Sequence, residues 1–493
     1  MKGGPTDIKT YILPILIVAG YLVFTTLVGL FQSRKVKQAR QFTVSRMSLW
    51  QAVTFLAGFT LGGGATYGVA GDTIKFGLTY LAWFPLSLAL GWWITGLLFA
   101  RRYFRLGGVT VPALLEKRYD QRVRLVCSLS TMVYAVFIIL LETYTLAIIV
   151  ETLVPSLTIA QATLVSLIVS VTSVAFSGIL GASTTNLIHY GVITTTFTIA
   201  LVALWKHVGG WNAAIDQVLE VLPNIANPGI DSHSWLSIIG LGWGVCGQLL
   251  LGKAGRLGGI SVVSHLSASC KDEGEAVRAF WLAGFLSGIP PLLSSLLGVF
   301  TAAFLGTHMA SLQAYESIGL AVGTINPILG AFLLAGVAAA ILSAYGPTAV
   351  LLASVFVDDI VKQSYSTSEK VERMLYTGII CLVSIFSAIY VALVGIKDIL
   401  PFLYKTAFPT TAPITIVTFF ALYTKKAGSR AAFWAVVLGV SIALLWGLAL
   451  NDPFGIPNIY IAFIIPIGIM TFDVLRKTVI EAKKKAEQHQ VII

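Results

Sequence analysis

The sequence predicts an all-α integral membrane protein, and three observations lead to that fold class. Of its 493 residues 56% are hydrophobic and 11% are charged, and the mean hydropathy is +0.85. A helix needs about 20 mostly apolar residues to cross a bilayer, and we predict about 13 such transmembrane helices in the chain. Lys and Arg are concentrated in alternate connections between these segments. Soluble globular domains do not combine these features.

The basic residues predict the orientation of the chain in the membrane. The predicted helices are centred near residues 20, 62, 88, 138, 168, 195, 243, 292, 340, 385, 412, 440 and 465. With the N-terminus outside, the cytoplasmic connections and tail hold every Lys and Arg, Lys253 and Arg256 among them, except Lys2, Lys9, Lys75, Lys206, Lys397 and Lys405. The positive-inside rule therefore predicts a multi-pass protein of the cell (plasma) membrane with a cytoplasmic C-terminus. This distribution explains the net charge of +11 without a nucleic-acid partner.

The second apolar segment, residues 55–78, is predicted to be a broken helix. It reads FLAGFTLGGGATYGVAGDTIKFGL, with Gly62, Gly63 and Gly64 together near its middle. Each glycine lowers helix propensity by about 1 kcal/mol relative to alanine. A break at membrane depth frees backbone groups, and these persist only where protein surrounds them or where they line a cavity. A functional site is therefore expected at this break.

Ionisable and amide side chains lie in two further predicted spans. Glu142 is near the middle of residues 125–154, and an ionisable residue at that depth costs at least about 2.5 kcal/mol and indicates a functional site. The alternative is that Glu142 holds the bundle together through a hydrogen bond. Asn186 and His189 are three residues apart and share one helix face, which makes them candidates for coupling. The alternative for His189 is a packing role.

A second glycine-rich span occurs five segments after the first. Residues 235–251 read WLSIIGLGWGVCGQLLL, with glycines at 240, 242, 244 and 247. Two interrupted spans at matching positions in two halves are typical of transporters built from an inverted repeat, with the solute bound at the breaks. The alternative is that the glycines only allow close helix packing.

The ninth segment, residues 329–354, offers oxygen atoms to a cation. Ala340, Ser343 and Ala344 share one face. Pro347 has no N–H, so the carbonyl of Ser343 loses its helical partner. Ser343 is thus expected to present a hydroxyl and a free carbonyl. A simple proline kink, with the serine bonded to its own helix, is the alternative.

These features together predict a secondary transporter of a small organic solute, such as an amino acid or carboxylate, working by alternating access. Free N–H groups at the two breaks suit a carboxylate or another polar group. The expected solute-binding residues are Thr60, Gly62, Gly63, Gly64, Glu142, Trp243, Gly244 and Gln248. A channel or a sensor on the same scaffold remains an alternative. The chain has no HExxH motif and no paired intramembrane histidines, so neither an enzyme nor a cofactor is expected.

Several motifs in the chain resemble those of the solute:sodium symporter family, which includes the sodium/proline, sodium/pantothenate and sodium/glucose cotransporters. The similar stretches are RRYFRLGGVTVPALLEKRYDQRVR, LYTKKAGSRAAFWA, the GQ pair at 247–248 and AAAILSAYGPTAVLLASVFVDDIVK. The resemblance implies a 5+5 inverted repeat with discontinuous helices, like that of the leucine transporter. Its expected parts are residues 1–49 (extra N-terminal helix and basic loop), 50–207 (first repeat), 208–427 (second repeat) and 428–493 (two helices and basic tail).

The same resemblance implies a Na⁺ site between the first broken helix and the ninth segment. It would use the carbonyls of Gly58, Leu61 and Ala340 and the hydroxyl of Ser343, with Ala344 at the position where the family usually has a second hydroxyl. The family's Thr-Asp-x-x-Gln pattern reads Thr-Asn-Leu-Ile-His at 185–189, so a carboxylate is replaced as well. Coupling to protons, or uncoupled transport, therefore remains an alternative to Na⁺. The expected partners are the solute and the lipid bilayer, and the expected assembly is a monomer or weak oligomer.

Overall fold

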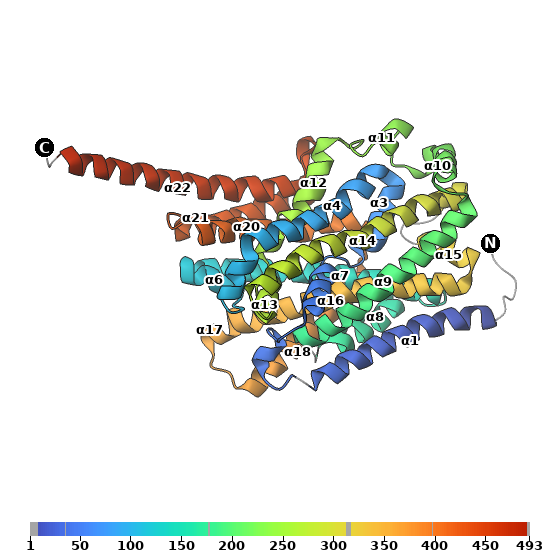
Figure 1. The fold of residues 1–493 in the computed structure, drawn as a ribbon, viewed down its shortest axis with the longest axis horizontal. Helices are drawn as coiled ribbons and strands as arrows, with labels where there is room; N and C mark the ends of the chain where they lie inside the picture. Colours follow the sequence, from blue (N-terminus) through green and yellow to red (C-terminus); the bar gives the residue numbers. More distant parts are fainter. Residues whose placement is uncertain (1–7, 35, 176–177, 312–316, 397, 491–493) are drawn as a thin grey trace.

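The computed structural model describes residues 8–34, 36–175, 178–311, 317–396 and 398–490. Within these ranges the regular secondary structure is helical, and they contain no strand. Figure 1 shows long helices lying side by side in one bundle, with the two ends of the chain at opposite ends of that bundle. The predicted all-α fold class is confirmed.

Ten helical stretches in the described ranges are long and apolar enough to cross a membrane. They contain α1 (Ile8–Ser33), α4 (Leu78–Thr95), α7 (Gln121–Leu153), α9 (Gly178–Val208), α14 (Glu273–Leu305), α16 (Pro327–Phe356), α18 (Glu369–Leu393), α20 (Phe408–Tyr423), α21 (Ser429–Leu444) and α22 (Asn458–Gln490). The bent pair Leu49–Phe59 and Gly64–Phe76 makes an eleventh span. The two other predicted segments, near residues 168 and 243, fall on helices of 16 and 13 residues, which are shorter than this criterion requires.

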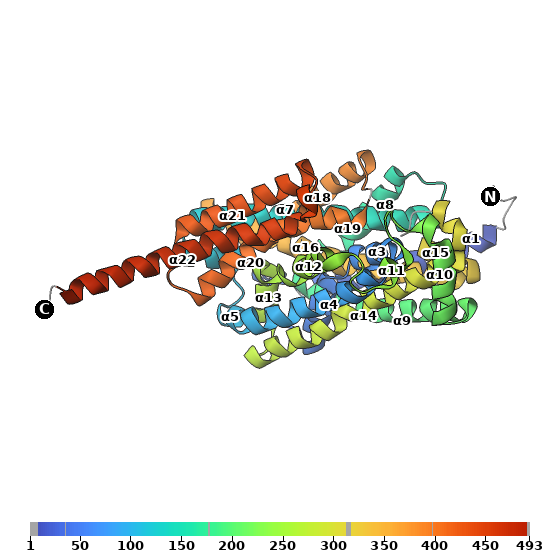
Figure 2. The ribbon, with the colours of Figure 1, turned by 90° about the horizontal axis from the view of Figure 1, so that it is seen from above.

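Shorter helices connect or complete the long ones. They are α2 (Leu49–Phe59), α3 (Val69–Phe76), α5 (Arg101–Arg105), α6 (Val111–Arg118), α8 (Ile159–Val174), α10 (Trp211–Ile225), α11 (Ser232–Leu236), α12 (Gly242–Ala254), α13 (Ser261–Ser269), α15 (Ser317–Ile325), α17 (Lys362–Ser364) and α19 (Ile399–Phe402). Figure 2 shows α22 projecting from the bundle at the end opposite to the start of α1.

Local sequence explains where the helices that build the centre of the molecule begin. Ser48 starts α2, since its hydroxyl accepts the N–H of Gln51 and the Gln51 side chain bonds back to the Ser48 N–H. Asp120 starts α7 by accepting the N–H of Val123. Asn326 precedes Pro327 and starts α16 in the same manner.

Helix α16 lies at the core of the bundle. It packs against α9, α7, α1, α18 and α2, and every residue from 333 to 355 is buried. A helix that is apolar on all sides is stable only when surrounded, and α16 has this composition. The α9, α7 and α2 side chains that touch it therefore face the interior of the protein, not lipid.

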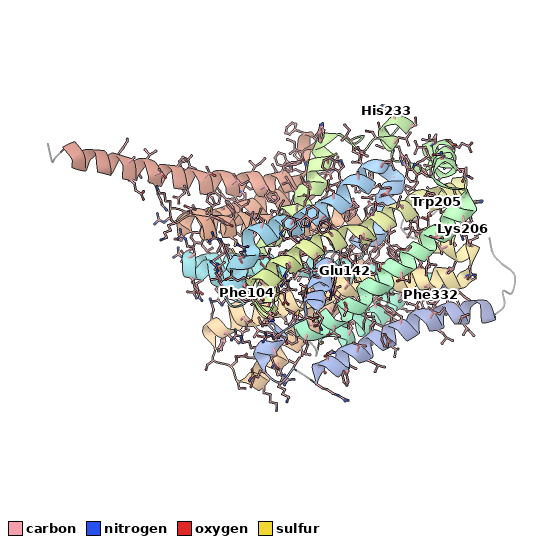
Figure 3. All side chains as sticks on the ribbon, viewed as in Figure 1. Phe104, Glu142, Trp205, Lys206, His233 and Phe332 are labelled. Carbon is pink, nitrogen blue, oxygen red and sulfur yellow. The ribbon has the colours of Figure 1, made fainter. Side chains whose placement is uncertain are left out.

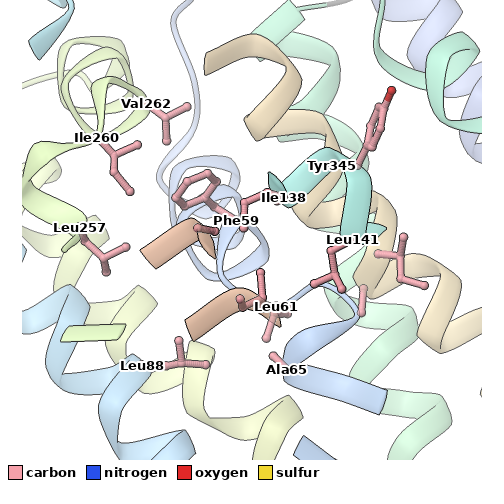
Figure 4. Close-up of a cluster of buried hydrophobic side chains, with 14 of the residues drawn as sticks. Phe59, Leu61, Ala65, Leu88, Ile138, Leu141, Leu257, Ile260, Val262 and Tyr345 are labelled. Atoms are coloured by element: carbon pink, nitrogen blue, oxygen red, sulfur yellow. The ribbon is translucent and has the colours of Figure 1, made fainter. Parts of the chain in front are cut away.

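The two discontinuous parts of the chain share one apolar cluster. Figure 4 shows Phe59 and Leu61, which flank the bend between α2 and α3, in the same region as Leu257 and Ile260. Leu88 of α4 also belongs to this cluster. These segments are far apart in sequence, so the cluster holds them against each other at the centre of the bundle.

Candidate functional site

The first interruption lies where the glycine run predicts it. Helix α2 ends at Phe59, a π-helical turn occupies Gly64–Gly68, and the direction of the span changes by 62°. Gly62 has φ +53°, a left-handed conformation that costs other residues about 1–2 kcal/mol. The predicted break in this span is confirmed.

Two neighbouring helices satisfy the N–H groups exposed by this break. The N–H of Gly62 donates to the carbonyl of Ala340 on α16 at 3.1 Å, and the N–H of Gly63 donates to Oε2 of Glu142 on α7 at 2.8 Å. A Cβ atom on Gly62 would lie 2.1 Å from Oε1 of Glu142, and one on Gly63 would lie 2.5 Å from the Thr145 side chain. Glycine is therefore required here by close approach as well as by backbone conformation.

Glu142 lies near the middle of the bundle, as Figure 3 shows. Its side chain is 3% exposed. The side chain therefore contributes to packing in the interior of the bundle by accepting the Gly63 N–H. Thr60, at the end of α2, accepts a hydrogen bond from the Trp92 indole at 3.4 Å, which places it on the α4 side of the bend.

The residues expected to bind Na⁺ are brought together between α2 and α16. The hydroxyl of Ser343 donates to the carbonyl of Ala340 at 2.7 Å and is 3.2 Å from that of Gly58. The Leu61 N–H donates to the Gly58 carbonyl at 3.0 Å, and the Leu61 carbonyl accepts from Ala65. Ala344 faces the same bend, since its Cβ would be 3.1 Å from a Cβ on Gly62. This cluster is rich in oxygen, as a hard cation requires.

Asn186 changes the expected role of the Ser343 carbonyl. Sequence reasoning left that carbonyl free because Pro347 cannot donate to it, but Nδ2 of Asn186 donates to it at 3.0 Å. Oδ1 of the same amide is buried and has no hydrogen-bond partner in the described structure. A Cβ on Gly58 would lie 2.6 Å from Asn186 Nδ2, so the amide contacts the cluster directly. The structure thus adds Asn186, which the sequence suggested for coupling, to the residues that surround the oxygen cluster.

His189 lies apart from this cluster although it shares a helix with Asn186. Its Nδ1 hydrogen-bonds the hydroxyl of Tyr21 on α1. The Asn186 and His189 side chains are both buried, but they contact different helices: Asn186 contacts α16 and His189 contacts α1. The structure therefore gives His189 a packing contact between α9 and α1, away from the bend.

The glycine-rich second span is interrupted within its predicted bounds and again after them. Residues 237–241, which include Gly240, separate α11 from α12, and Gly242 has φ +77°. Helix α12 then runs without a break from Gly242 to Ala254, and a further interruption spans residues 255–260, before α13. Trp243 is 69% exposed and packs edge-on against Trp83. The Gly244 carbonyl accepts from the Tyr460 hydroxyl at 2.7 Å, and Gln248 is only half-buried one turn further along α12.

The solute-binding role of Trp243, Gly244 and Gln248 stays a prediction, since these residues follow the interruption at 237–241 and Trp243 is largely exposed. A Cβ on Gly247 would lie 2.1 Å from the Tyr460 hydroxyl. The glycine there lets α12 approach α22, which is the close-packing alternative considered for this span. The backbone does not need to leave the helix to achieve that contact.

Side chains hold the interruption at residues 255–260, which we call the second interruption, in place. The hydroxyl of Tyr103 donates to the carbonyl of Gly258, and the N–H of Gly259 donates to Oγ1 of Thr415 at 2.9 Å. The same hydroxyl of Thr415 donates to the carbonyl of Arg256 at 2.7 Å. The freed backbone groups thus find partners on α5 and α20, as an interrupted segment in a membrane requires.

Two basic residues at this interruption are buried, Lys253 in the last turn of α12 and Arg256 in the interruption itself, although their sequence positions predicted cytoplasmic connections. Lys253 is 3% and Arg256 2% exposed. Arg256 donates from Nε to the Gly252 carbonyl at 2.8 Å and from Nη1 to the Tyr134 hydroxyl at 2.9 Å. The clue in the sequence is GKAGRLGGI, where glycines flank both cations.

Comparison with known proteins now identifies the class of the molecule. The family model described as sodium:solute symporter family matches residues 42–439. The chain belongs to the sodium:solute symporter family. It is therefore a cation-coupled secondary transporter that imports a small solute, not an enzyme, and it is a multi-pass membrane protein.

Two curated relatives and two solved structures resemble this symporter. It is 23% identical over 438 residues to the high-affinity proline transporter PutP of Bacillus subtilis (strain 168), covering 86% of this chain and 90% of that one. It is 23% identical over 449 residues to the osmoregulated proline transporter OpuE of the same organism, covering 86% and 87%.

The solved structures show the likeness of fold. One is a Na⁺-coupled sialic acid symporter in a substrate-bound outward-open state, with a TM-score of 0.77, 17% identity, and coverage of 94% of this chain and 97% of that one. The other is MHP1, a nucleobase-cation-symport-1 family transporter, with a TM-score of 0.56, 13% identity, and coverage of 88% and 94%. This symporter therefore shares its helical architecture with transporters.

Proposed function

We propose that this symporter imports a small organic solute, an amino acid or a carboxylate, across the cell membrane with Na⁺ as the coupling ion. The observation that carries the proposal is the oxygen cluster at the first bend, where Gly58, Ala340, Ser343 and Asn186 meet. Alternating access would open and close the cluster because α2 and α16 contribute to it from opposite sides.

The proposed ion site uses the carbonyls of Gly58 and Ala340, the hydroxyl of Ser343 and Oδ1 of Asn186. Leu61 adds a carbonyl at the bend, while Ala344 has no side-chain oxygen to give. A buried acceptor without a donor costs about 1–3 kcal/mol. Asn186 Oδ1 has such an environment, and a bound cation would relieve it.

The proposed architecture is a 5+5 inverted repeat within 13 spans. Counting α8 and the interrupted pair α12 and α13 as spans adds two to the eleven that meet the length criterion. The first repeat, residues 50–207, would then begin with the interrupted pair α2 and α3. The second, residues 208–427, would begin with α12 and α13, and this correspondence supports the proposal.

The proposed orientation places the N-terminus outside and the C-terminus in the cytoplasm of the cell membrane. Helix α1 starts at the opposite end of the bundle from the projecting end of α22. The end with α22 also carries the basic connections before α7 and before α21. Positively charged connections are retained on the cytoplasmic side, so this distribution supports the orientation.

Thermal unfolding of the purified protein in NaCl, KCl and choline chloride tests the ion site. We expect Na⁺ to raise the Tm. We expect Ser343→Ala to raise the apparent Kd for Na⁺, obtained from the Tm as a function of Na⁺ concentration, about tenfold, which corresponds to about 1.4 kcal/mol. Ser354→Ala is the matched control, because Ser354 is buried on the same helix and bonds only its own backbone, at Leu351. A Na⁺ effect that is equal in both variants contradicts the site.

Uptake into proteoliposomes separates Na⁺ coupling from the alternatives. A panel of labelled proline, alanine, lactate, pyruvate, benzoate and glucose is offered under an inward Na⁺ gradient. Na⁺-driven accumulation that an ionophore abolishes supports the proposal. Accumulation driven by an inward proton gradient without Na⁺ favours proton coupling, and equilibration without accumulation favours uncoupled transport.

A further inference from the structure

Three ionisable side chains are buried where the interruption at residues 255–260 approaches α7. Lys253 lies in the last turn of α12, Arg256 lies in the interruption, and Glu142 belongs to α7. All three are at most 3% exposed. Lys253 and Arg256 both lie over the ring of Phe408, and Arg256 Nη1 donates to the Tyr134 hydroxyl of α7. With all three ionised, the group would hold two cations and one carboxylate, a surplus of one positive charge inside the protein.

The surplus charge has no counter-charge elsewhere in the described structure. Lys253 and Arg256 make no ion pair there, and Glu142 already accepts a hydrogen bond from Gly63. Asp72, the buried carboxylate of α3, has Lys75 as its own opposite charge. An uncompensated charge in a membrane interior is costly and indicates a functional role.

The surroundings of the two cations are aromatic. Lys253 Nζ lies 4.9 Å from the centre of the Phe84 ring and 4.7 Å from that of Phe408. The Arg256 guanidinium lies 4.2 Å from the Phe408 ring and uses Nε and Nη1 for hydrogen bonds, while Nη2 makes none. Ring faces stabilise cations without neutralising them. The ammonium of Lys253, which makes no hydrogen bond in the described structure, and Nη2 of Arg256 therefore keep donors for an acceptor from outside.

We propose that the transported solute is a small monoanion, a monocarboxylate without an ammonium group, and that its carboxylate binds Lys253 and Arg256. This rests on the proposed function and narrows its solute class. A monocarboxylate would neutralise the surplus charge, and its apolar part would contact Phe84 and Phe408. A zwitterionic amino acid would bring a second ammonium beside two cations and leave the total charge unchanged. The inference therefore separates this symporter from the proline transporters that it resembles.

Thermal shift and uptake with the full-length protein test the inference. In NaCl, lactate, pyruvate or benzoate is expected to raise the Tm, whereas proline, alanine and glucose are not. Lys253→Met is expected to weaken the monocarboxylate effect at least tenfold, and Lys253→Arg, which retains the charge, to preserve part of it. Lys206→Met is the control, because Lys206 is an exposed lysine at the end of α9.

Lys253→Met also reports on folding. Methionine removes an uncompensated buried charge at similar volume, so its Tm without solute is expected to equal or exceed that of the wild type. Its stabilisation by Na⁺ is expected to persist, since Ser343 is unchanged. A shift by proline or glucose, no shift by any of the three monocarboxylates, or an undiminished shift in Lys253→Met overturns the inference. Loss of the Na⁺ effect in the wild type contradicts the proposed function instead.

Discussion

The interruption after α2 and the interruption at residues 255–260 are stabilised by different kinds of residues. At the first, glycines allow the backbone itself to reach Ala340 and Glu142, and the polar partners come from α16 and α7. At the second, the hydroxyls of Tyr103 and Thr415 satisfy the backbone, and the segment adds two cations of its own. The first interruption therefore depends on the close approach of glycine backbone to its neighbours, and the second contains buried basic side chains.

This difference separates two tasks that a symporter must combine. The oxygen cluster beside the first interruption suits a small hard cation, whose binding depends on the number and spacing of oxygens. The aromatic and cationic surroundings of the second suit an organic anion. Changes at the first interruption are therefore expected to affect ion binding and folding together, while changes at the second affect solute choice.

Gly62→Ala is expected to have the largest effect of the changes that test this comparison. The positive φ costs about 1–2 kcal/mol for alanine, and overlap of the new Cβ with Glu142 adds about 1–3 kcal/mol. We expect a lower Tm and loss of uptake. Gly20→Ala, at an exposed position of α1 with no atom within 4 Å of its added Cβ, is the control. Normal uptake by Gly62→Ala would show that the close approach is dispensable.

Glu142→Gln tests whether the two interruptions share one charge. The amide oxygen still accepts the Gly63 N–H, but Lys253 loses the carboxylate with which it would interact. We expect destabilisation that Lys253→Met partly reverses, with a coupling of about 1–3 kcal/mol in a double-mutant cycle measured by unfolding. Additive effects of the two changes would mean that Glu142 and Lys253 act independently.

Thr415→Val tests the second interruption alone. It removes the acceptor of the Gly259 N–H and the donor to the Arg256 carbonyl, and we expect a loss of about 1–2 kcal/mol in unfolding free energy. Thr418→Val is the matched control, since Thr418 is also buried on α20 and, in the described structure, bonds only the Ile414 carbonyl of its own helix. Equal effects of the two variants would deny Thr415 a special role.

Arg105→Ala is expected to have the smallest effect. Arg105 lies at the end of α5, two residues after Tyr103, and pairs with Glu273 at 2.8 Å, with side-chain exposures of 68% and 36%. Such exposed pairs contribute little to stability and weaken with ionic strength. Tm measured at low and high KCl should show a small difference that disappears at high salt, and a large salt-independent loss would contradict this.

The first interruption was predictable because three adjacent glycines each lower helix propensity by about 1 kcal/mol. The interruption at residues 255–260 was missed because the glycines of the second span mark only the turn at 237–241, while Gly247 serves the packing of Tyr460. Lys253 and Arg256 escaped notice because a cation after an apolar run usually marks a membrane boundary. Their burial depends on Phe84 and Phe408, which are distant in sequence.

The position of Glu142 has one further consequence. Its carboxylate accepts the Gly63 N–H of one interrupted span, and its charge would interact with the Lys253 ammonium of the other. An anion arriving at Lys253 would compete for that ammonium and so redistribute the attraction felt by Glu142. Binding of the solute at the second interruption would thus change the interactions of Glu142 at the first interruption directly, with no other residue between them.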